Sequence, residues 1–380
     1  MYFIMKNISL FEPNISNLEK KIVIKSLSKN QISSYGYFTD LFIHKVKKIT
    51  NSKYNLATSS GSSALFLALK SIGIKKDEIV ITQSYTFAAT TNAIILNNSI
   101  PLLLDVSLND LNLDFNQLDY FLKKNTFKSR GYTYHKKTKK KITCICYVLT
   151  LGIIPDLDKI NFFKKKYKLK IIFDAACALG HKYKNQNLSK YCDVAIYSLN
   201  GNKNFTAGAG GLLSTNIFKY YNFAKIFANN GKRFMAYNYQ TTGFNFNMSS
   251  LNGALALAQV KRFHEININK VKIRNFYKKY LSPIKLFNTD FIWGKYLPWI
   301  NFFLTKTKEE KKKIISTLRK NNVMSNNFWL PMHKHPIKKH FILTKYPNTN
   351  YIYDRILVLP SSTFLLLKNI KKITNIIKKI

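Results

Sequence analysis

The chain has 380 residues, of which 46% are hydrophobic and 14% aromatic, so it is expected to fold into two domains and not to be disordered. Its 61 Lys and Arg against 18 Asp and Glu give a net charge of +43, which could attract nucleic acid or anionic lipid. Lysine dominates over arginine, however, and the basic residues are spread along the whole chain, so nucleic-acid binding is not expected as the main function.

Membrane, secretory and metal functions are not expected either. No run of about 18 apolar residues is present. The first residues, "MYFIMKNISLFEPNIS", lack a basic leader and a small-residue cleavage site, so they are interpreted as mature protein. The cysteines fit no common zinc spacing and no disulfide scaffold, which favours a reducing cytoplasm and no metal. They are Cys144, Cys146, Cys177 and Cys192.

Short apolar segments alternate with helical patterns through the first two-thirds of the chain. Helices are predicted at 63–74 and 156–168, and residues 130–141 are expected to form an exposed loop. Strand–helix alternation with continuously apolar strands is typical of an α/β fold on a largely parallel sheet, in which ligands bind beyond the carboxyl ends of the strands. The predicted buried strands are 78–84, 100–107, 141–150, 170–176 and 193–199.

The pattern changes near residue 250. A long helix is predicted over 249–268, followed by a strand-like segment at 293–306 and a Lys-rich helix near 308–320. The chain then ends with "LVLPSSTFL" and a closing helix. We therefore expect a large domain over 1–249 and a smaller α+β domain over 250–380, on which the N-terminal segment can pack.

Three local features carry possible chemistry. In "SSGSSALFLALK", Gly61 and Ser62 directly precede a helix, where N–H groups and hydroxyls suit a phosphate, although ordinary helix capping explains the same pattern. Asp174 ends an apolar strand, where a carboxylate needs a cationic or N–H partner or caps the following turn. Lys203 follows the next strand in "SLNGNKNFTAGAGG"; a buried lysine can attack carbonyls, but a single loop lysine is usually at the surface.

Together these features match the needs of pyridoxal 5′-phosphate. Its aldehyde is held by a lysine as a Schiff base, its pyridine nitrogen is kept protonated by an acid, and its phosphate needs a cradle. An aromatic ring often lies over the pyridine. Phe87 in "QSYTFAATTNAI" could supply that ring or could simply pack in the core.

The chain resembles the DegT/StrS-type sugar aminotransferases, which have the fold-type-I architecture, over nearly its whole length. The resembling blocks are "SSGSSALFLAL", "QSYTFAATTNAI", "PLLLDV", "IIFDAACALG", "SLNGNKNFTAGAGGLL", "GFNFNMSSLNGALALAQ" and "LPMHKHP". "SLNGNKNFTAGAGG" and "LPSSTFL" are most similar to the branch that aminates nucleotide-linked 4-keto-6-deoxy-N-acetylhexosamines.

The resemblance implies roles for individual residues. Lys203 would hold the cofactor and move the proton, and Asp174 would pair with the pyridinium nitrogen. Cys177 would lie near the 3-hydroxyl, and His333 near the sugar. The other implied cofactor-binding residues are Gly61, Ser62, Ser63 and Ser198 around the phosphate, Phe87 on the ring, Asn200, and Asn245 or Asn247, which would reach the neighbouring subunit's phosphate in a homodimer.

Four positions depart from the family pattern. Ser62 stands where Thr is usual, and Cys177 where Gln, His or Glu is usual; cysteine is a weak hydrogen-bonding residue. Asn247 replaces an Arg of many members, and Leu149 replaces a His. Dehydratases of this family have histidine at the lysine position, and Lys203 argues against that activity.

The sequence thus predicts a transaminase that uses pyridoxal phosphate. The amino donor implied by the resemblance is L-glutamate, and the acceptor is the 4-keto group of a nucleotide-linked deoxysugar, with UDP-linked N-acetylhexosamine favoured, in cell-surface glycan biosynthesis. The alternative is a protein of the same fold that binds the cofactor or nucleic acid without turnover.

Overall fold

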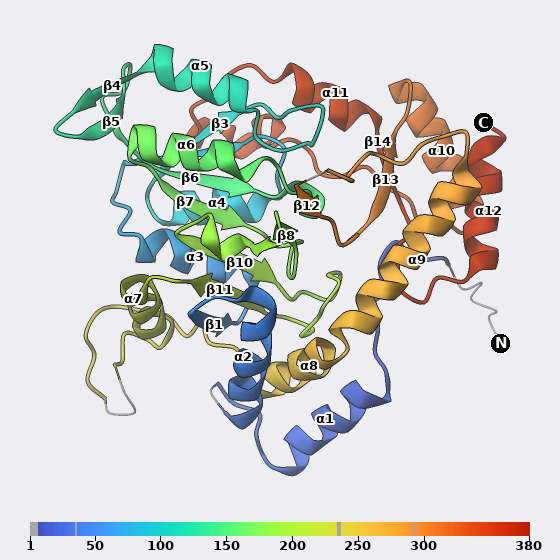
Figure 1. Cartoon of the computed structure of the whole chain (residues 1–380), viewed down its shortest axis with the longest axis horizontal. Helices are drawn as coiled ribbons and strands as arrows, with labels where there is room; N and C mark the ends of the chain where they lie inside the picture. Colours follow the sequence, from blue (N-terminus) through green and yellow to red (C-terminus); the bar gives the residue numbers. More distant parts are fainter. Residues whose placement is uncertain (1–6, 35, 234–236, 292) are drawn as a thin grey trace.

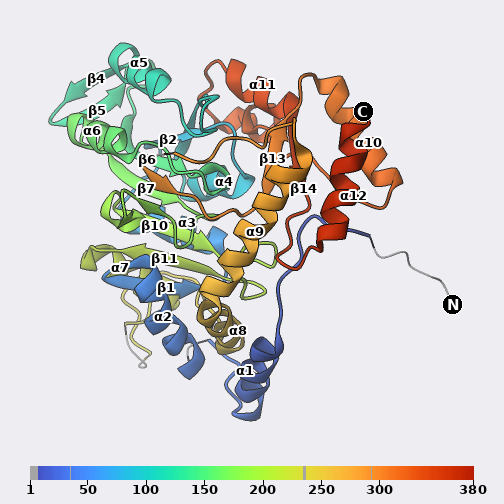
Figure 2. The same cartoon turned by 45° about the vertical axis from the view of Figure 1, so that its right-hand side comes forward.

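The computed structural model describes residues 7–34, 36–233, 237–291 and 293–380. They form an α/β body around one large sheet and a smaller part at the C-terminal end. The long helix α9 (Phe263–Leu281) runs from the first part to the second (Figures 1 and 2). The predicted fold class, a mostly parallel sheet flanked by helices with a smaller α+β part, is confirmed.

The central strands of the large sheet pair in parallel, in the order β10, β7, β6, β2, β3. These are the five strands predicted from apolar runs. Two further strands, β11 and β1, continue the sheet in antiparallel pairing and were not predicted. The bounds are β1 (Tyr54–Thr58), β2 (Ile79–Gln83), β3 (Ile100–Leu104), β6 (Lys141–Val148), β7 (Lys170–Asp174), β10 (Val194–Ser198) and β11 (Gly211–Thr215).

The exposed loop expected over 130–141 is wrong in part, because a β-hairpin occupies much of this region. Strands β4 (Thr126–Ser129) and β5 (Tyr132–His135) pair with each other, and β5 also pairs with β6. Arg130 and Gly131 between them both have positive φ, as a two-residue hairpin turn requires. The hairpin projects from the end of the body near α5 (Figure 1).

Both faces of the sheet are covered by helices because successive strand residues point to opposite sides. Ile171 and Phe173 belong to the core on one face, and Ile172 to the core on the other. The first face packs against α2 (Tyr37–Thr50), α5 (Phe115–Asn125), α6 (Leu157–Tyr167) and α8 (Ser250–Lys261). The second packs against α3 (Gly61–Ser71), α4 (Ala88–Leu96) and α7 (Phe218–Ala228). The predicted helices at 63–74 and 156–168 are confirmed as α3 and α6.

The single helix predicted over 249–268 is wrong, because two helices occupy that segment. Helix α8 ends at Lys261, and α9 begins after Arg262. The guanidinium of Arg262 is held at this break by the buried carboxylate of Glu19 on α1 (Asn17–Ser28), with N–O distances of 2.9 and 3.0 Å. Helix α8 packs on α1 and α2. The domain boundary at 249/250 therefore stays a prediction.

The C-terminal part has a core of its own, formed by α9, α10, α12 and the antiparallel pair β13–β14. Of the strand-like segment at 293–306, only β12 and β13 are strands. No helix in the described ranges is long and apolar enough to cross a membrane. The bounds here are β12 (Gly294–Lys295), β13 (Asn301–Leu304), α10 (Lys308–Lys320), α11 (Pro347–Arg355), β14 (Ile356–Leu359) and α12 (Leu367–Lys378). Short elements elsewhere are η1 (Thr150–Gly152), β8 (Lys182–Tyr183), β9 (Gln186–Asn187), η2 (Leu188–Lys190), η3 (Met332–Lys334) and η4 (Pro336–His340).

One buried carboxylate joins the two parts of the molecule. Asp105 follows β3 in the large sheet and is 2% exposed. Its oxygens accept hydrogen bonds from the N–H groups of Asn348 and Thr349, both at 2.8 Å, and from the Thr349 hydroxyl at 2.6 Å. These are the first-turn donors of α11, which have no partner inside the helix. Asp105 thus caps a C-terminal helix from the sheet and fixes how the C-terminal part sits on it.

We predict that Asp105→Asn lowers the stability of the protein by about 1–3 kcal/mol, because a buried amide cannot accept all of these hydrogen bonds. The midpoint of urea unfolding, followed by circular dichroism, measures the change. Asp114→Asn is the matched control. Asp114 also caps a helix, α5, but is partly exposed, and Asn caps about as well as Asp. Equal shifts for the two variants would contradict the anchoring role.

Candidate active site

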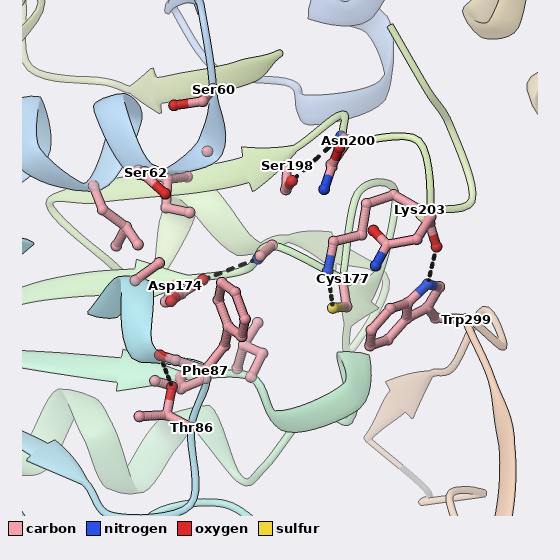
Figure 3. Close-up of a pocket in the computed structure, with 18 of the residues that line it drawn as sticks. Ser60, Ser62, Thr86, Phe87, Asp174, Cys177, Ser198, Asn200, Lys203 and Trp299 are labelled. Atoms are coloured by element: carbon pink, nitrogen blue, oxygen red, sulfur yellow. Dashed lines mark hydrogen bonds between the residues drawn. The ribbon is translucent and has the colours of Figure 1, made fainter. Parts of the chain in front are cut away.

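A cavity lies at the carboxyl ends of the central strands, where β7 ends at Asp174 and β10 ends at Ser198 (Figure 3). The start of α3, the loop after β10 and the C-terminal part complete its wall. No group of His, Cys, Asp and Glu within the described ranges is arranged to hold a metal ion. The cavity is lined by Ser60, Gly61, Ser62, Leu65, Thr86, Phe87, Ala89, Val148, Leu149, Asp174, Ala176, Cys177, Ile196, Ser198, Asn200, Asn202, Lys203, Ala209, Gly210, Trp299, Phe328 and Trp329.

Asp174 is buried in this wall without a cationic side chain bonded to it. One of its oxygens accepts a hydrogen bond from the hydroxyl of Thr90 at 2.7 Å, and the other from the N–H of Ala176 at 3.2 Å. The Ala176 contact is the turn cap that the sequence left open as an alternative. Burial raises the pKa of the Asp174 carboxyl above its ordinary value, although both hydrogen bonds and the charge of Lys203 act in the opposite direction. A cation in the cavity would relieve that cost.

Lys203 lies in the loop between β10 and β11, and its side chain points into the cavity (Figure 3). Its amine lies 3.1 Å from the sulfur of Cys177 and 4.0 Å from the ring centre of Trp299. The loop returns on itself, because the N–H of Ala207 bonds to the carbonyl of Leu199 at 2.8 Å. The reading of Lys203 as an ordinary surface lysine is therefore wrong.

The start of α3 approaches the end of β10 closely enough to form a cradle. Ser60 is the residue that caps α3, because its hydroxyl accepts from the N–H of Ser63 at 3.0 Å. Gly61 and Ser62 are thus left in the cavity wall beside Ser198. A Cβ on Gly211 would lie 2.3 Å from the carbonyl oxygen of Ser60, so only glycine allows this approach. Capping and cradle are both present, on different residues.

Phe87 lies at the start of α4 with 58% of its surface exposed, so the alternative that it packs in the core is wrong. It lines the cavity, and its ring centre is 6.3 Å from that of Trp329. The predicted site residues Asn200 and Cys177 also line the cavity, and so does Leu149.

Three other predicted site residues lie outside the cavity. The hydroxyl of Ser63 is used inside the α3 cap, where it bonds to Ser60. Asn247 is buried, and its amide donates to the carbonyl of Ala228 at 2.7 Å. Asn245 is exposed and bonded only weakly to Ser34, at 3.4 Å. Of the two asparagines, only Asn245 therefore presents its side chain outward.

His333 also lies outside the lining of the cavity. Its Nδ1 shares a 2.6 Å hydrogen bond with the hydroxyl of Ser84, and its Nε2 lies 3.2 Å from the side-chain oxygen of Asn350. The imidazole stacks on Tyr346, and burial lowers its pKa. In this structure the histidine supports the segment after β2 that leads to Phe87. Its contact with a sugar stays a prediction.

The residues that contact Asp174 and Lys203 were not predicted from the sequence. Thr90 stands one helical turn after Phe87, and this spacing could have indicated it. Trp299, Phe328 and Trp329 come from the C-terminal part and add aromatic rings to the lining of the cavity. Nothing near them in the sequence signals this position, because it depends on how the C-terminal part packs.

The cavity fits pyridoxal 5′-phosphate. Asp174 is a buried carboxylate that needs a cation, which a protonated pyridine nitrogen supplies. The start of α3 with Gly61, Ser62 and Ser198 offers donors for a phosphate. Lys203 brings a primary amine into the same cavity.

Two curated relatives have names that refer to nucleotide sugars. The chain is 26% identical over 334 residues to a GDP-perosamine synthase of Escherichia coli O157:H7, which covers 88% of this chain and 87% of the relative. It is 29% identical over 282 residues to a UDP-4-amino-4,6-dideoxy-N-acetyl-beta-L-altrosamine transaminase of Campylobacter jejuni, which covers 72% and 71%.

Solved structures share the fold along the whole chain. Helicobacter pylori PseC, an aminotransferase involved in the biosynthesis of pseudoaminic acid, has a TM-score of 0.88 at 22% identity and covers 98% of this chain and 99% of its own. The putative sugar aminotransferase Spr1654 of Streptococcus pneumoniae, solved in its PMP form, has a TM-score of 0.87 at 20% identity and covers 98% of both chains.

Residues 13–378 match the model of a protein family, the DegT/DnrJ/EryC1/StrS aminotransferases. This match confirms the expected family, enzyme class and cofactor. The chain belongs to the DegT/DnrJ/EryC1/StrS aminotransferase family, and the aminotransferases of this family depend on pyridoxal phosphate.

Proposed function

We propose that the protein transfers an amino group from L-glutamate to the 4-keto group of a nucleotide-linked 4-keto-6-deoxysugar, with UDP-linked N-acetylhexosamine as the first candidate. The resulting aminosugar would serve cell-surface glycan biosynthesis. The printed names of two relatives, a GDP-perosamine synthase and a transaminase for a UDP-linked N-acetyl-altrosamine, support this substrate class. The free state of all four cysteines agrees with a reducing cytoplasm as the place of action.

The observation that carries the proposal is the joint presence of Lys203 and Asp174 in one cavity. The cofactor, when bound, supplies an aldehyde that condenses with amines and a ring that acts as an electron sink. Lys203 would anchor the cofactor and move a proton at the reacting carbon. Asp174, oriented by Thr90, would keep the ring nitrogen protonated. These two roles need an amine and an acid in one cavity, which Lys203 and Asp174 supply.

The remaining wall would bind and orient. Gly61, Ser62 and Ser198 would hold the phosphate at the start of α3. The exposed ring of Phe87 would lie against the cofactor. Trp299 and Phe328 would exclude water from the face opposite Asp174, where electrostatic interactions become stronger.

A homodimer with the site at the subunit interface belongs to the same proposal. Asn245 is its candidate residue, because its side chain is exposed. It lies in the segment that follows α7, and the neighbouring Phe246 bonds to the N–H of Ser59 near the cradle. Asn247 is less suited to reach a second subunit, since its amide is already used within its own chain.

The direct test is to assay purified protein against a panel of UDP-, GDP- and dTDP-linked 4-ketosugars with glutamate as donor. We expect 2-oxoglutarate and an aminosugar nucleotide in equal amounts, with ping-pong kinetics. A visible absorption band with pyridoxal phosphate that bleaches on adding glutamate is the expected first sign. A band that persists with every amino donor would favour the alternative of a non-catalytic cofactor-binding protein.

Replacing the lysine tests its covalent role. Lys203→Ala should remove the visible band and lower the rate of amino transfer by about 10²–10⁴-fold or more, because both the anchor and the proton carrier are lost. Absorbance and the coupled assay measure the two effects. Lys184→Ala is the control, since Lys184 is an exposed lysine that pairs with Asp158 at the surface. If Lys203→Ala kept the band, another residue would be the anchor.

Removing one hydroxyl tests the support of Asp174. Thr90→Val should weaken binding of pyridoxal phosphate by roughly 10–100-fold, because a hydrogen bond to a charged group is lost. Thr90→Ser, which keeps the hydroxyl, should bind nearly as the natural protein does. Titration of cofactor-free protein followed by absorbance gives the affinities. Equal affinities for Val and Ser would contradict the role.

The pH dependence of the same variant has a defined sign. The Thr90 hydrogen bond lowers the pKa of Asp174, so its loss raises that pKa further. A carboxyl with a raised pKa becomes neutral at a higher pH as the solution is acidified. Cofactor affinity in Thr90→Val should therefore begin to fall at a higher pH than in the natural protein. A profile shifted to lower pH would be contrary to this expectation.

A further inference from the structure

The amine of Lys203 contacts two side chains, and neither of them is a carboxylate. The sulfur of Cys177 is 3.1 Å from the nitrogen, and the indole ring centre of Trp299 is 4.0 Å from it (Figure 3). The ammonium group of a lysine is attracted to the face of an aromatic ring within about 6 Å, and most strongly to tryptophan. The amine therefore has a defined position on the far side of the cavity from the Thr90–Asp174 pair.

Trp299 is held in place independently of Lys203. Its indole N–H donates to the carbonyl of Asn202, the residue before the lysine, at 2.7 Å. Phe11 from the N-terminal segment stacks on it with ring centres 5.6 Å apart and an angle of 12°. Phe328 meets it edge-on at 5.8 Å. Trp299 is only 1% exposed, so its indole ring has little freedom to move. Its hydrogen bond to Asn202 also fixes the loop that carries Lys203.

A buried lysine on α9, Lys270, holds the backbone of Trp299. The amine of Lys270 donates to the carbonyl of Trp299 at 2.9 Å and to that of Ser361 at 2.6 Å. Lys270 is 6% exposed, and burial lowers its pKa to about 7. It thereby ties the backbone of Trp299 to the segment after β14. Phe11 thus fixes the ring of Trp299, and Lys270 fixes its backbone carbonyl.

This inference rests on the proposed function. A transaminase lysine moves protons as a free amine, so it must hold a defined position whenever it is not bonded to the cofactor. A long side chain in an open cavity would otherwise sample many rotamers. We propose that Trp299 is a positioning residue that, together with the thiol of Cys177, holds the nitrogen of Lys203 in the place from which it attacks once it has lost its proton.

The test compares two forms of the cofactor on the full chain stripped of cofactor. Covalent attachment of pyridoxal phosphate forms a C=N bond between the lysine nitrogen and the aldehyde carbon, and the aldehyde oxygen leaves as water. Pyridoxamine phosphate has no aldehyde, so it would bind in the same cavity without a covalent bond to the lysine. Trp299→Leu should slow covalent attachment of pyridoxal phosphate, followed by stopped-flow absorbance, by roughly tenfold. The affinity of the Trp299→Leu variant for pyridoxamine phosphate should stay within about twofold of the natural protein's. The reason is that the proposed phosphate-binding residues Gly61, Ser62 and Ser198 are unchanged.

Trp299→Phe keeps an aromatic face and should slow attachment less than Trp299→Leu does. Trp293→Leu is the matched control; Trp293 is a partly buried tryptophan whose indole N–H donates to Ile154, and it does not line the cavity. This control should leave the attachment rate unchanged.

Two results would overturn the inference. One is an attachment rate in Trp299→Leu equal to that of the natural protein. The other is an equal loss for both cofactor forms, which would make Trp299 merely structural. The measurement needs no sugar substrate. If the natural protein attaches pyridoxal phosphate but aminates no ketosugar, the proposed function fails and the role of Trp299 can still be decided.

Discussion

Parallel pairing of β7 with β10 brings the acid and the amine of this site together. Asp174 pairs with Ile196 in the register of the two strands, two residues before β10 ends at Ser198. Parallel strands end at the same edge of a sheet, so the residue that ends one strand meets the loop that follows the next. In this way the fold brings together Asp174 and Lys203, which are separated by 28 residues in the sequence. The cradle at the start of α3 reaches the same edge because β11, which begins with Gly211, packs against Ser60.

The sheet and the loops that follow its strands supply only some of the residues that line the cavity. The C-terminal part contributes three aromatic rings to its lining, those of Trp299, Phe328 and Trp329. Asp105 fixes that part on the sheet by capping α11. The N-terminal segment lies against the same part, since the N–H of Ser361 bonds to Leu10. The chemistry at Asp174 and Lys203 therefore depends on contacts made far from them in sequence, and a mutation at such a contact can alter the site without touching it.

Sequence patterns predict what is set locally. Apolar runs indicated the five parallel strands, and their ends indicated Asp174 and Lys203, because strand ends and helix starts are written in adjacent residues. The break at Arg262 escaped prediction since it depends on Glu19, more than 200 residues away. Trp299 escaped for the same reason. Asn247 and Ser63 occupy motif positions of the family, but their side chains are bonded within the fold, so their roles at the cofactor stay predictions. Resemblance to a motif predicts where a residue lies in the fold, but it does not predict which way its side chain points.

The site keeps its two reactive groups apart by giving each a different kind of partner. Asp174 is held by a hydroxyl and a backbone N–H, which stabilise negative charge. Lys203 is held by a thiol and an indole face, which attract an amine without forming an ion pair. A carboxylate beside the lysine would bind it more strongly, and that ion pair would have to break before the amine could bond to carbon. Burial also raises the pKa of the Cys177 thiol, which keeps this partner neutral. Cys177 therefore gives the nitrogen of Lys203 a neutral hydrogen-bond partner within the cavity.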